Sequence, residues 1–138
     1  MTSVDTQLIL DASRFPLIEV TVPARVGVRD IDDGFHLLEQ WVSAGSIALL
    51  IDFRAVALQH ATADLRSYFY RGKNAFDRGA GKDRVVVEAL VMSSLFERVL
   101  FQSYLWMKTA RTYESRAFRT IETARTYCTR TVETIVAV

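Results

Sequence analysis

The sequence predicts an α/β domain in which about four α-helices flank one mixed β-sheet, in the order ββαβαβαβα. The continuous apolar stretch at 47–53 is typical of a strand covered on both faces, and the segment 84–92 is expected to be another central strand. Segments with apolar residues at helical spacing alternate with the strands, which indicates a layered sandwich with right-handed crossovers. No linker or low-complexity tract interrupts the pattern, so we expect one domain over residues 1–138.

The chain is expected to begin with an antiparallel pair of strands. The segments 7–13 (QLILDAS) and 17–24 (LIEVTVPA) are short and rich in β-branched residues, and a turn fits around residues 14–16. Pro16 suits the start of the second strand, where a missing N–H matters least.

A first helix should follow, with Asp30 as its N-cap and Gly45 at its end. Asp32 and Asp33 would lie in the first turn, where the helix dipole favours anions. The apolar positions at helical spacing are Ile31, Phe35, Leu38 and Val42. The apolar stretch 47–53 is then the first buried strand.

A second helix is expected from about Thr62 to Gly79, with one apolar face and with Gly72 as a weak point. That face consists of Leu65, Phe69, Gly72 and Phe76. The segment RGAGKD (78–83) ends the helix, and the apolar strand 84–92 follows. RGAGKD lacks the full spacing of a phosphate-binding loop and precedes a strand, so we interpret it as a turn.

The last third of the chain completes the pattern with a helix, a strand and a helix. Ser94 and Glu97 have the spacing of a capping box, which predicts a third helix to about Lys108. A short strand fits 111–118. Thr120 can cap the final helix, whose apolar stripe consists of Ile121, Ala124, Cys128, Val132 and Ile135.

We expect no nucleic-acid partner and no transmembrane segment, although the net charge by itself is uninformative about nucleic acid or membranes. The net charge is +1, and the apolar runs are far shorter than the roughly 18 residues of a membrane helix. Cys128 is the only cysteine, which excludes an internal disulfide and fits a reducing compartment. The N-terminus carries Asp5 and no basic region, so no signal peptide is expected. We therefore expect a cytoplasmic protein.

Arginine outnumbers lysine fourteen to three, and the charges are unevenly spread. Residues 1–40 are mostly acidic, whereas residues 98–138 are mostly basic. Codon usage in a GC-rich genome explains the arginines simply. An acidic partner, or self-association between opposite faces, is the alternative.

The sequence offers no catalytic or metal-binding constellation, so we expect neither an enzyme nor a cofactor. His36 is expected to be partly buried in the first helix. His60 follows Asp52 by eight residues, but no Ser or Cys lies in a nucleophile elbow nearby. The carboxylates of RDIDD (29–33) suit a helix start better than a metal. A buried Cys128 would be inert.

Aromatic residues are too numerous for the buried faces of the second and third predicted helices. Some are therefore exposed, or they cover a groove or a partner. Core packing alone is one explanation of these aromatics, and a dimer interface or an apolar pocket is the alternative. The residues that would contact an apolar ligand are Phe69, Phe76, Phe96, Tyr104 and Trp106.

The element order resembles the STAS fold of anti-sigma-factor antagonists, closest to the bacterial SpoIIAA-like branch that is labelled STAS/SEC14-like. Three segments carry the resemblance: IALLIDFRAV (47–56), SSLFERVLF (93–101) and SRAFRTIETARTYCTR (115–130). In the last segment Phe118, Glu122 and Ala124 match the family, whereas Tyr127 or Cys128 replaces its usual Trp. The resemblance spans roughly residues 7–132.

The resemblance implies a non-catalytic regulatory or scaffold module that docks a protein partner through residues 54–64 and the second helix. The expected contact residues are Asp52, Arg54, His60, Thr62, Arg66 and Tyr70. Antagonists of this type carry a phosphorylated Ser after the strand. Here QHATADL (59–65) has no Ser, and Thr62 is the nearest hydroxyl that could be phosphorylated, although Asp64 would repel the phosphate. The SEC14-like relation implies an alternative, a carrier or sensor with an apolar ligand between the sheet and the second and third helices.

Overall fold

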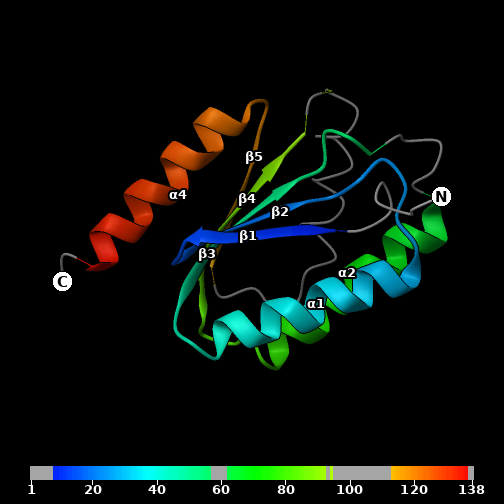
Figure 1. Ribbon diagram of the computed structural model, residues 1–138, viewed down its shortest axis with the longest axis horizontal. Helices are drawn as coiled ribbons and strands as arrows, with labels where there is room; N and C mark the ends of the chain where they lie inside the picture. The colour runs from blue at the N-terminus through cyan, green and yellow to red at the C-terminus, as the bar shows by residue number, and fades with distance from the viewer. Residues whose placement is uncertain (1–7, 57–61, 93, 95–112, 137–138) are drawn as a thin grey trace.

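A five-stranded mixed sheet forms the middle layer of the computed structural model, which describes residues 8–56, 62–92, 94 and 113–136 (Figure 1). The strands lie side by side in chain order: β1 (Ile9–Arg14), β2 (Leu17–Thr21), β3 (Ile47–Asp52), β4 (Val85–Val91) and β5 (Glu114–Phe118). β1 runs antiparallel to β2, and each later pair of neighbours is parallel. The predicted α/β class and mixed sheet are therefore confirmed.

Three helices flank the sheet within the described residues. α1 (Val28–Val42) and α2 (Ala63–Arg78) pack against each other on one face, and α4 (Ile121–Val136) covers the opposite face (Figure 1). Of the helix expected over 94–108, all but Ser94 lies outside the described residues. Three of the four expected helices are therefore present in the part of the chain that the structure describes.

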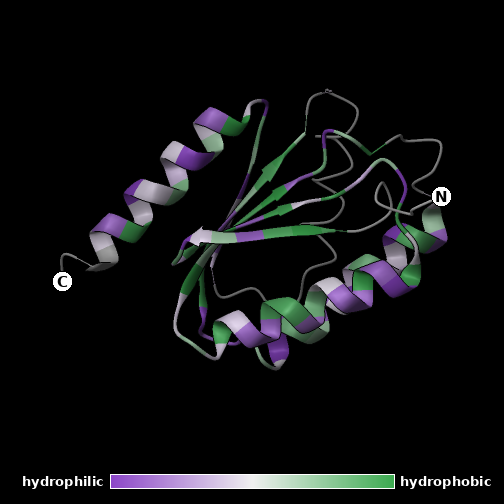
Figure 2. Cartoon of the chain, viewed as in Figure 1, coloured by the Kyte–Doolittle hydropathy of each residue, from purple (hydrophilic) through white to green (hydrophobic). Residues whose placement is uncertain are grey.

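Strand β3 shows why residues 47–51 are all apolar. Ile47, Leu49 and Ile51 belong to the cluster beneath α1 and α2. Ala48 and Leu50 point the other way, into the cluster beneath α4. Because successive strand residues face opposite sides, a strand covered on both faces must be apolar throughout. Figure 2 shows the same hydrophobic colouring along the central strands.

The start of α1 differs from the prediction. Gly27, not Asp30, is the N-cap residue, and the Gly27 N–H donates to Oδ2 of Asp30 at 2.8 Å. Asp30 therefore lies inside the first turn and caps the helix by reaching back, which fits the favourable position of an anion there. The helix ends at Val42, before Gly45.

The predicted caps of the two later helices are confirmed. Oγ1 of Thr62 accepts a hydrogen bond from the backbone N–H of Leu65 at 3.2 Å, and α2 begins at the next residue, Ala63. Oγ1 of Thr120 accepts from the N–H of Thr123 at 3.3 Å, at the start of α4. Each hydroxyl satisfies a helix donor that otherwise has no partner in the helix.

Gly72 has a packing role that the sequence did not reveal. A Cβ atom at this position would lie 2.7 Å from Cε2 of Phe35, closer than real Cβ contacts. The missing side chain thus lets the Phe35 ring of α1 lie directly on α2. A glycine inside a helix costs about 1 kcal/mol relative to alanine, and the close approach of the two helices explains its presence.

Candidate functional site

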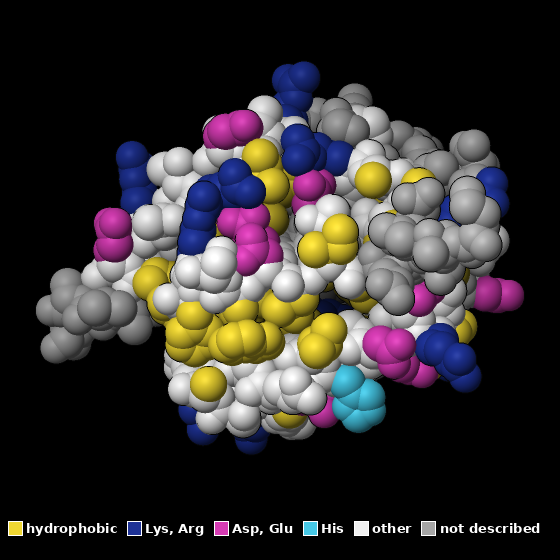
Figure 3. All heavy atoms as spheres, viewed as in Figure 1, with side chains coloured by type: hydrophobic (Ala, Val, Ile, Leu, Met, Phe, Trp, Pro, Cys, Tyr) yellow, Lys and Arg dark blue, Asp and Glu magenta, His cyan; other side chains and the backbone are white. Residues whose placement is uncertain are grey.

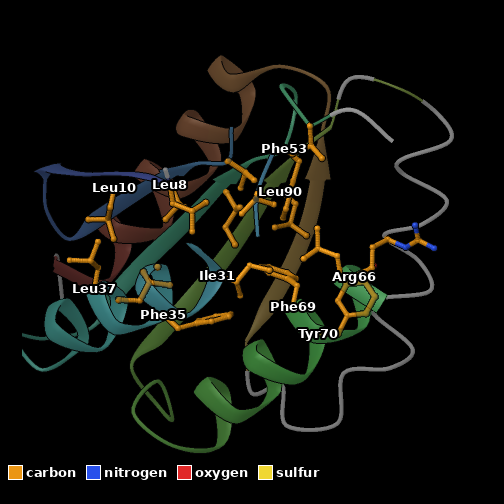
Figure 4. Close-up of a pocket in the computed structure, with 18 of the residues that line it drawn as sticks. Leu8, Leu10, Ile31, Phe35, Leu37, Phe53, Arg66, Phe69, Tyr70 and Leu90 are labelled. Atoms are coloured by element: carbon orange, nitrogen blue, oxygen red, sulfur yellow. The ribbon is translucent and has the colours of Figure 1, made fainter. Parts of the chain in front are cut away.

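An apolar cavity of about 160 Å³ lies between the sheet and helices α1 and α2 (Figure 4). β1 and β2 contribute aliphatic side chains such as Leu10 and Val20, α1 contributes Ile31 and Leu38, and α2 contributes Leu65. Protein interiors are normally packed so closely that few voids exceed the size of a water molecule. An apolar cavity of about 150 Å³ in another protein stays dry and binds benzene, so this space is large enough for a small organic molecule.

Aromatic rings hold part of the cavity wall in place. The ring centroids of Phe35 and Phe69 are 5.8 Å apart, and those of Phe53 and Phe69 are 5.7 Å apart with planes at 87°. These three residues come from α1, the end of β3 and α2, and all of them line the cavity. Edge-to-face and tilted contacts of this kind stabilise aromatic clusters beyond the area they bury. The wall is therefore built from side chains with few alternative rotamers.

The apolar lining continues to the surface between β1 and α1. Leu37 lines the cavity and is 39% exposed. Phe15, in the turn between β1 and β2, is 40% exposed and its ring lies 5.6 Å from that of Trp41. Figure 3 shows hydrophobic side chains gathered in the furrow between β1 and α1. A ligand would therefore have an entry path from solvent.

The lining of the cavity is apolar almost throughout, and the guanidinium of Arg66 points away from the other lining side chains (Figure 4). Leu10 and Leu37 lie at one end, and Arg66 and Tyr70 at the other (Figure 4). Among the described residues of the lining, Arg66 is the only charged one and Tyr70 has the only hydroxyl. Burial raises the pKa of Tyr70, and the positive charge of Arg66 partly opposes that rise. The arginine charge is therefore felt at the tyrosine hydroxyl.

Asp52 and Arg54, two of the expected partner contacts, form an ion pair with each other. The Arg54 side chain donates to both carboxylate oxygens of Asp52, at 3.0 and 2.9 Å, and the Arg54 backbone N–H donates at 3.0 Å. Burial alone would raise the pKa of Asp52, but these hydrogen bonds outweigh it and lower the pKa. The ion pair fixes the conformation of the chain directly after β3, so we assign it a structural role.

The expected partner-binding residues do not gather on one surface. In β3, Asp52 follows Ala48 and Leu50 on the side of the sheet that α4 covers. Thr62 caps α2 on the other side, and Arg66 and Tyr70 line the cavity. His60 lies outside the described residues. Docking through residues 54–64 therefore stays a prediction.

The residues expected to bind an apolar ligand divide into three groups. Phe69 lines the cavity, as predicted. Phe76 is buried in the hydrophobic core, with its ring 6.0 Å from that of Phe35, and does not line the cavity. Phe96, Tyr104 and Trp106 lie outside the described residues.

A buried polar cluster, which we call the Lys73 network, was missed by the sequence analysis. Nζ of Lys73 lies 2.9 Å from Oδ1 of Asp77 and 3.0 Å from Oε2 of Glu88, and it also donates to the Tyr113 hydroxyl. Tyr113 donates to Asp77 at 2.8 Å, and Ser115 donates to Glu88 at 2.8 Å. All five residues are buried, and Lys73 and Glu88 are 0% exposed. We therefore assign the network a structural role.

Glu88 was the signal that could have revealed this network. It interrupts an otherwise apolar strand, RVVVEALVM, and a buried carboxylate needs a cation or donors nearby. Lys73 lies four residues after Phe69 and three before Phe76, so it shares their helix face. A lysine on the buried face of a helix and a glutamate in a buried strand therefore predict an ion pair between Lys73 and Glu88.

The remaining candidate side chains offer no reactive site. Cys128 of α4 is fully buried against the sheet, and burial raises the pKa of its thiol to about 12. The His36 side chain is 79% exposed and lies 3.7 Å from Glu39, so the expectation that it is partly buried is wrong. Within the described ranges, no group of three or more His, Cys, Asp or Glu residues is placed to hold a metal ion.

Comparison with known proteins finds no match: no protein family, no curated protein and no solved structure is similar to this chain. The resemblance to the STAS fold therefore stays a prediction. Across the residues that the structure describes, no helix has the length and apolar character needed to cross a membrane.

Proposed function

We propose that this protein binds a small apolar ligand in the cavity between the sheet and helices α1 and α2, without transforming it. The cavity itself carries the proposal, since its lining is almost wholly apolar and reaches the surface at Leu37. Ligand sites are typically concave and apolar, with a few polar groups that fix orientation. Arg66 and Tyr70 line one end of the cavity, chiefly with the apolar parts of their side chains.

Binding of a small apolar ligand, the alternative implied by the SEC14-like relation, thus has more support than partner docking. The location that we propose for the ligand differs from the one implied by that relation. We place the ligand against α1 and α2 instead of the second and third predicted helices. Phe35 and Phe69 would contact it from the two helices, and Val20 and Ile51 from the sheet.

Titration of the protein with 1-octanol, followed by amide NMR spectra, tests the proposal. Saturable shifts are expected for cavity-lining residues on α1 and α2. Leu65→Trp places a bulky ring at the third position of α2, in the lining, and should weaken binding roughly tenfold. Ile121→Trp is the matched control, because Ile121 is a partly buried residue in the first turn of α4, on the opposite face.

Two results would contradict the proposal. One is the absence of saturable shifts in the wild-type protein. The other is equal weakening by Leu65→Trp and Ile121→Trp, which would indicate a general effect of added bulk. Native mass spectrometry of protein purified from cells adds an independent measurement, because a retained apolar molecule would support binding in the cell.

Docking of a protein partner is a second candidate, favoured by the exposed position of Thr62 at the start of α2. A phosphate there would lie at a helix N-terminus, where the dipole stabilises negative charge. Thr62→Glu is expected to change partner capture in a pull-down, whereas Thr120→Glu, at the exposed cap of α4, should not. Identical capture by both variants would count against this candidate.

A further inference from the structure

We infer that the cavity takes a compact, uncharged ligand about the size of a single ring and without a hydrogen-bonding group, of the alkylbenzene class. This inference rests on the proposed function and makes the ligand specific. It follows from the chemistry of the lining, from the aromatic rings in the cavity wall and from the volume of the cavity.

The lining side chains give a ligand almost no partner for a hydrogen bond. Apart from Arg66 and Tyr70, every lining residue in the described part of the chain is aliphatic, aromatic, methionine or glycine. The guanidinium of Arg66 points away from the other lining side chains (Figure 4). The surface that a ligand would contact is therefore apolar almost throughout.

The backbone of the surrounding strands is hydrogen-bonded within the sheet. Val20 of β2, Ile51 of β3 and Leu90 of β4 form one row across the cavity wall, in which Val20 pairs with Ile51 and Ile51 pairs with Leu90. Backbone groups in such a parallel ladder bond to the neighbouring strands. The sheet therefore offers a ligand side chains and no backbone donors or acceptors at these positions.

The first helical turns, where backbone N–H groups often lack a partner, are also satisfied at the lining residues. The N–H of Ile31 donates to the carbonyl oxygen of Gly27 at 3.2 Å. The N–H of Leu65 donates to Oγ1 of Thr62 at 3.2 Å. A hydroxyl on a buried ligand would therefore lose its water without gaining a partner, which weakens binding roughly tenfold or more.

Aromatic rings in the wall favour a ligand that is itself a ring. The centroids of Phe53 and Phe69 are 5.7 Å apart with planes at 87°, and those of Phe69 and Tyr70 are 6.1 Å apart with planes at 69°. A ring that packs against this wall can make further contacts of the same edge-to-face kind. It also has no flexible chain whose conformational freedom is lost on binding.

The volume of about 160 Å³ matches one ring, since an apolar cavity of about 150 Å³ in another protein holds benzene. Phe53 and Phe69 lie away from Leu10 and from Leu37, where the lining reaches the surface (Figure 4). A single ring packed against Phe53 and Phe69 would bury any polar substituent with it. A long chain such as 1-octanol can extend toward Leu37 and keep its hydroxyl in water.

The test compares toluene with phenol, in which a hydroxyl replaces a methyl group of nearly the same size. Binding is measured by calorimetry at neutral pH, and amide NMR locates each compound. One toluene molecule should bind per chain, roughly tenfold or more tightly than phenol. Benzoate and benzylamine carry opposite charges, and neither should give saturable binding, because the cavity offers no partner for a buried charge.

Val20→Thr tests the cause of this preference, and Val87→Thr is its matched control. Val20 lines the cavity, whereas Val87 is buried in β4 on the face that α4 covers. Threonine keeps the shape of valine and adds a hydroxyl to which phenol can bond. The preference for toluene over phenol should shrink roughly fivefold in Val20→Thr and persist in Val87→Thr. The wild-type comparison decides the inference even if a variant fails to fold.

The outcomes separate this inference from the proposed function. The inference would be overturned if phenol or benzoate bound the wild-type protein as tightly as toluene, or if 1-octanol bound and toluene did not. It would also be overturned if the two threonine variants showed the same preference. Each of these results would leave apolar binding intact. Failure of both toluene and 1-octanol to bind would overturn the proposed function, and the inference with it.

Discussion

Replacing Lys73 with methionine is expected to destabilise the folded protein by about 3–5 kcal/mol at neutral pH. The Lys73 ammonium is 0% exposed and lies within 3.0 Å of carboxylate oxygens of both Asp77 and Glu88, which are themselves buried. Methionine keeps much of the volume of the side chain but removes the cation. Two carboxylates then remain in the interior without the charge that faces them.

The size of this loss makes it easy to measure. A domain of this length typically has about 5–15 kcal/mol of stability, so the variant should fold but unfold at a much lower denaturant concentration. The midpoint of thermal unfolding should fall by about 10–20 °C. Urea denaturation followed by circular dichroism gives the free energy of unfolding directly. Lys82→Met is the control, because Lys82 is exposed in the turn before β4 and its loss should cost less than about 0.5 kcal/mol.

A double variant checks that the loss comes from the network. Lys73→Met combined with Glu88→Gln removes the cation and one of the anions together. The combined loss should be smaller than the sum of the two single losses, with a coupling of about 0.5–3 kcal/mol. The reasoning would be refuted if Lys73→Met matched Lys82→Met, or if the two single losses simply added.

Three further predictions concern single residues. Gly72→Ala should destabilise the protein by about 1–3 kcal/mol in urea, although alanine favours helices, because its Cβ would meet Phe35 at 2.7 Å; a gain in stability would refute the close approach. Cys128 should fail to react with a thiol reagent at mildly alkaline pH in the folded protein and react fully in denaturant, because burial raises its pKa to about 12; equal rates would contradict its burial. The Asp52–Arg54 pair lowers the pKa of Asp52 below its ordinary 3.8, so its stabilisation is present above that pH and is lost as pH falls through the folded-state pKa. The stability difference between wild type and Asp52→Asn should therefore narrow below about pH 4, and a constant difference would exclude this linkage.

Local patterns in the sequence predicted most of the fold because they depend on neighbours along the chain. The apolar run at 47–53 and the threonine caps of α2 and α4 each carry their own physical reason. The N-cap of α1 was placed wrongly at Asp30. An aspartate can cap a helix as the N-cap residue or from the third position of the first turn, and the residue type alone does not distinguish these two positions.

The candidate site depended on contacts between elements far apart in the sequence, and these were not predictable from spacing. The cavity lies under α1 and α2, which pack together on one face of the sheet. Gly72 of α2 leaves room for the Phe35 ring of α1, and this contact joins residues 37 positions apart in the sequence. Phe69 was predicted as a ligand contact from its helix face. Lys73 lies on the same helix face as Phe69, but a lysine is normally expected at a solvent-exposed position. Its burial becomes predictable only when Glu88 is recognised as its partner.

The alternation of side chains along β3 lets the two sides of the sheet change separately. Ala48 and Leu50 help to pack α4 in full contact, while Ile51 faces the hollow side. Substitutions at Leu65 or Val56 can change the shape of the cavity without touching the packing of α4 on the other face. Under the proposed function, such a chain can change its ligand preference during evolution while it keeps the packing on the opposite face of the sheet.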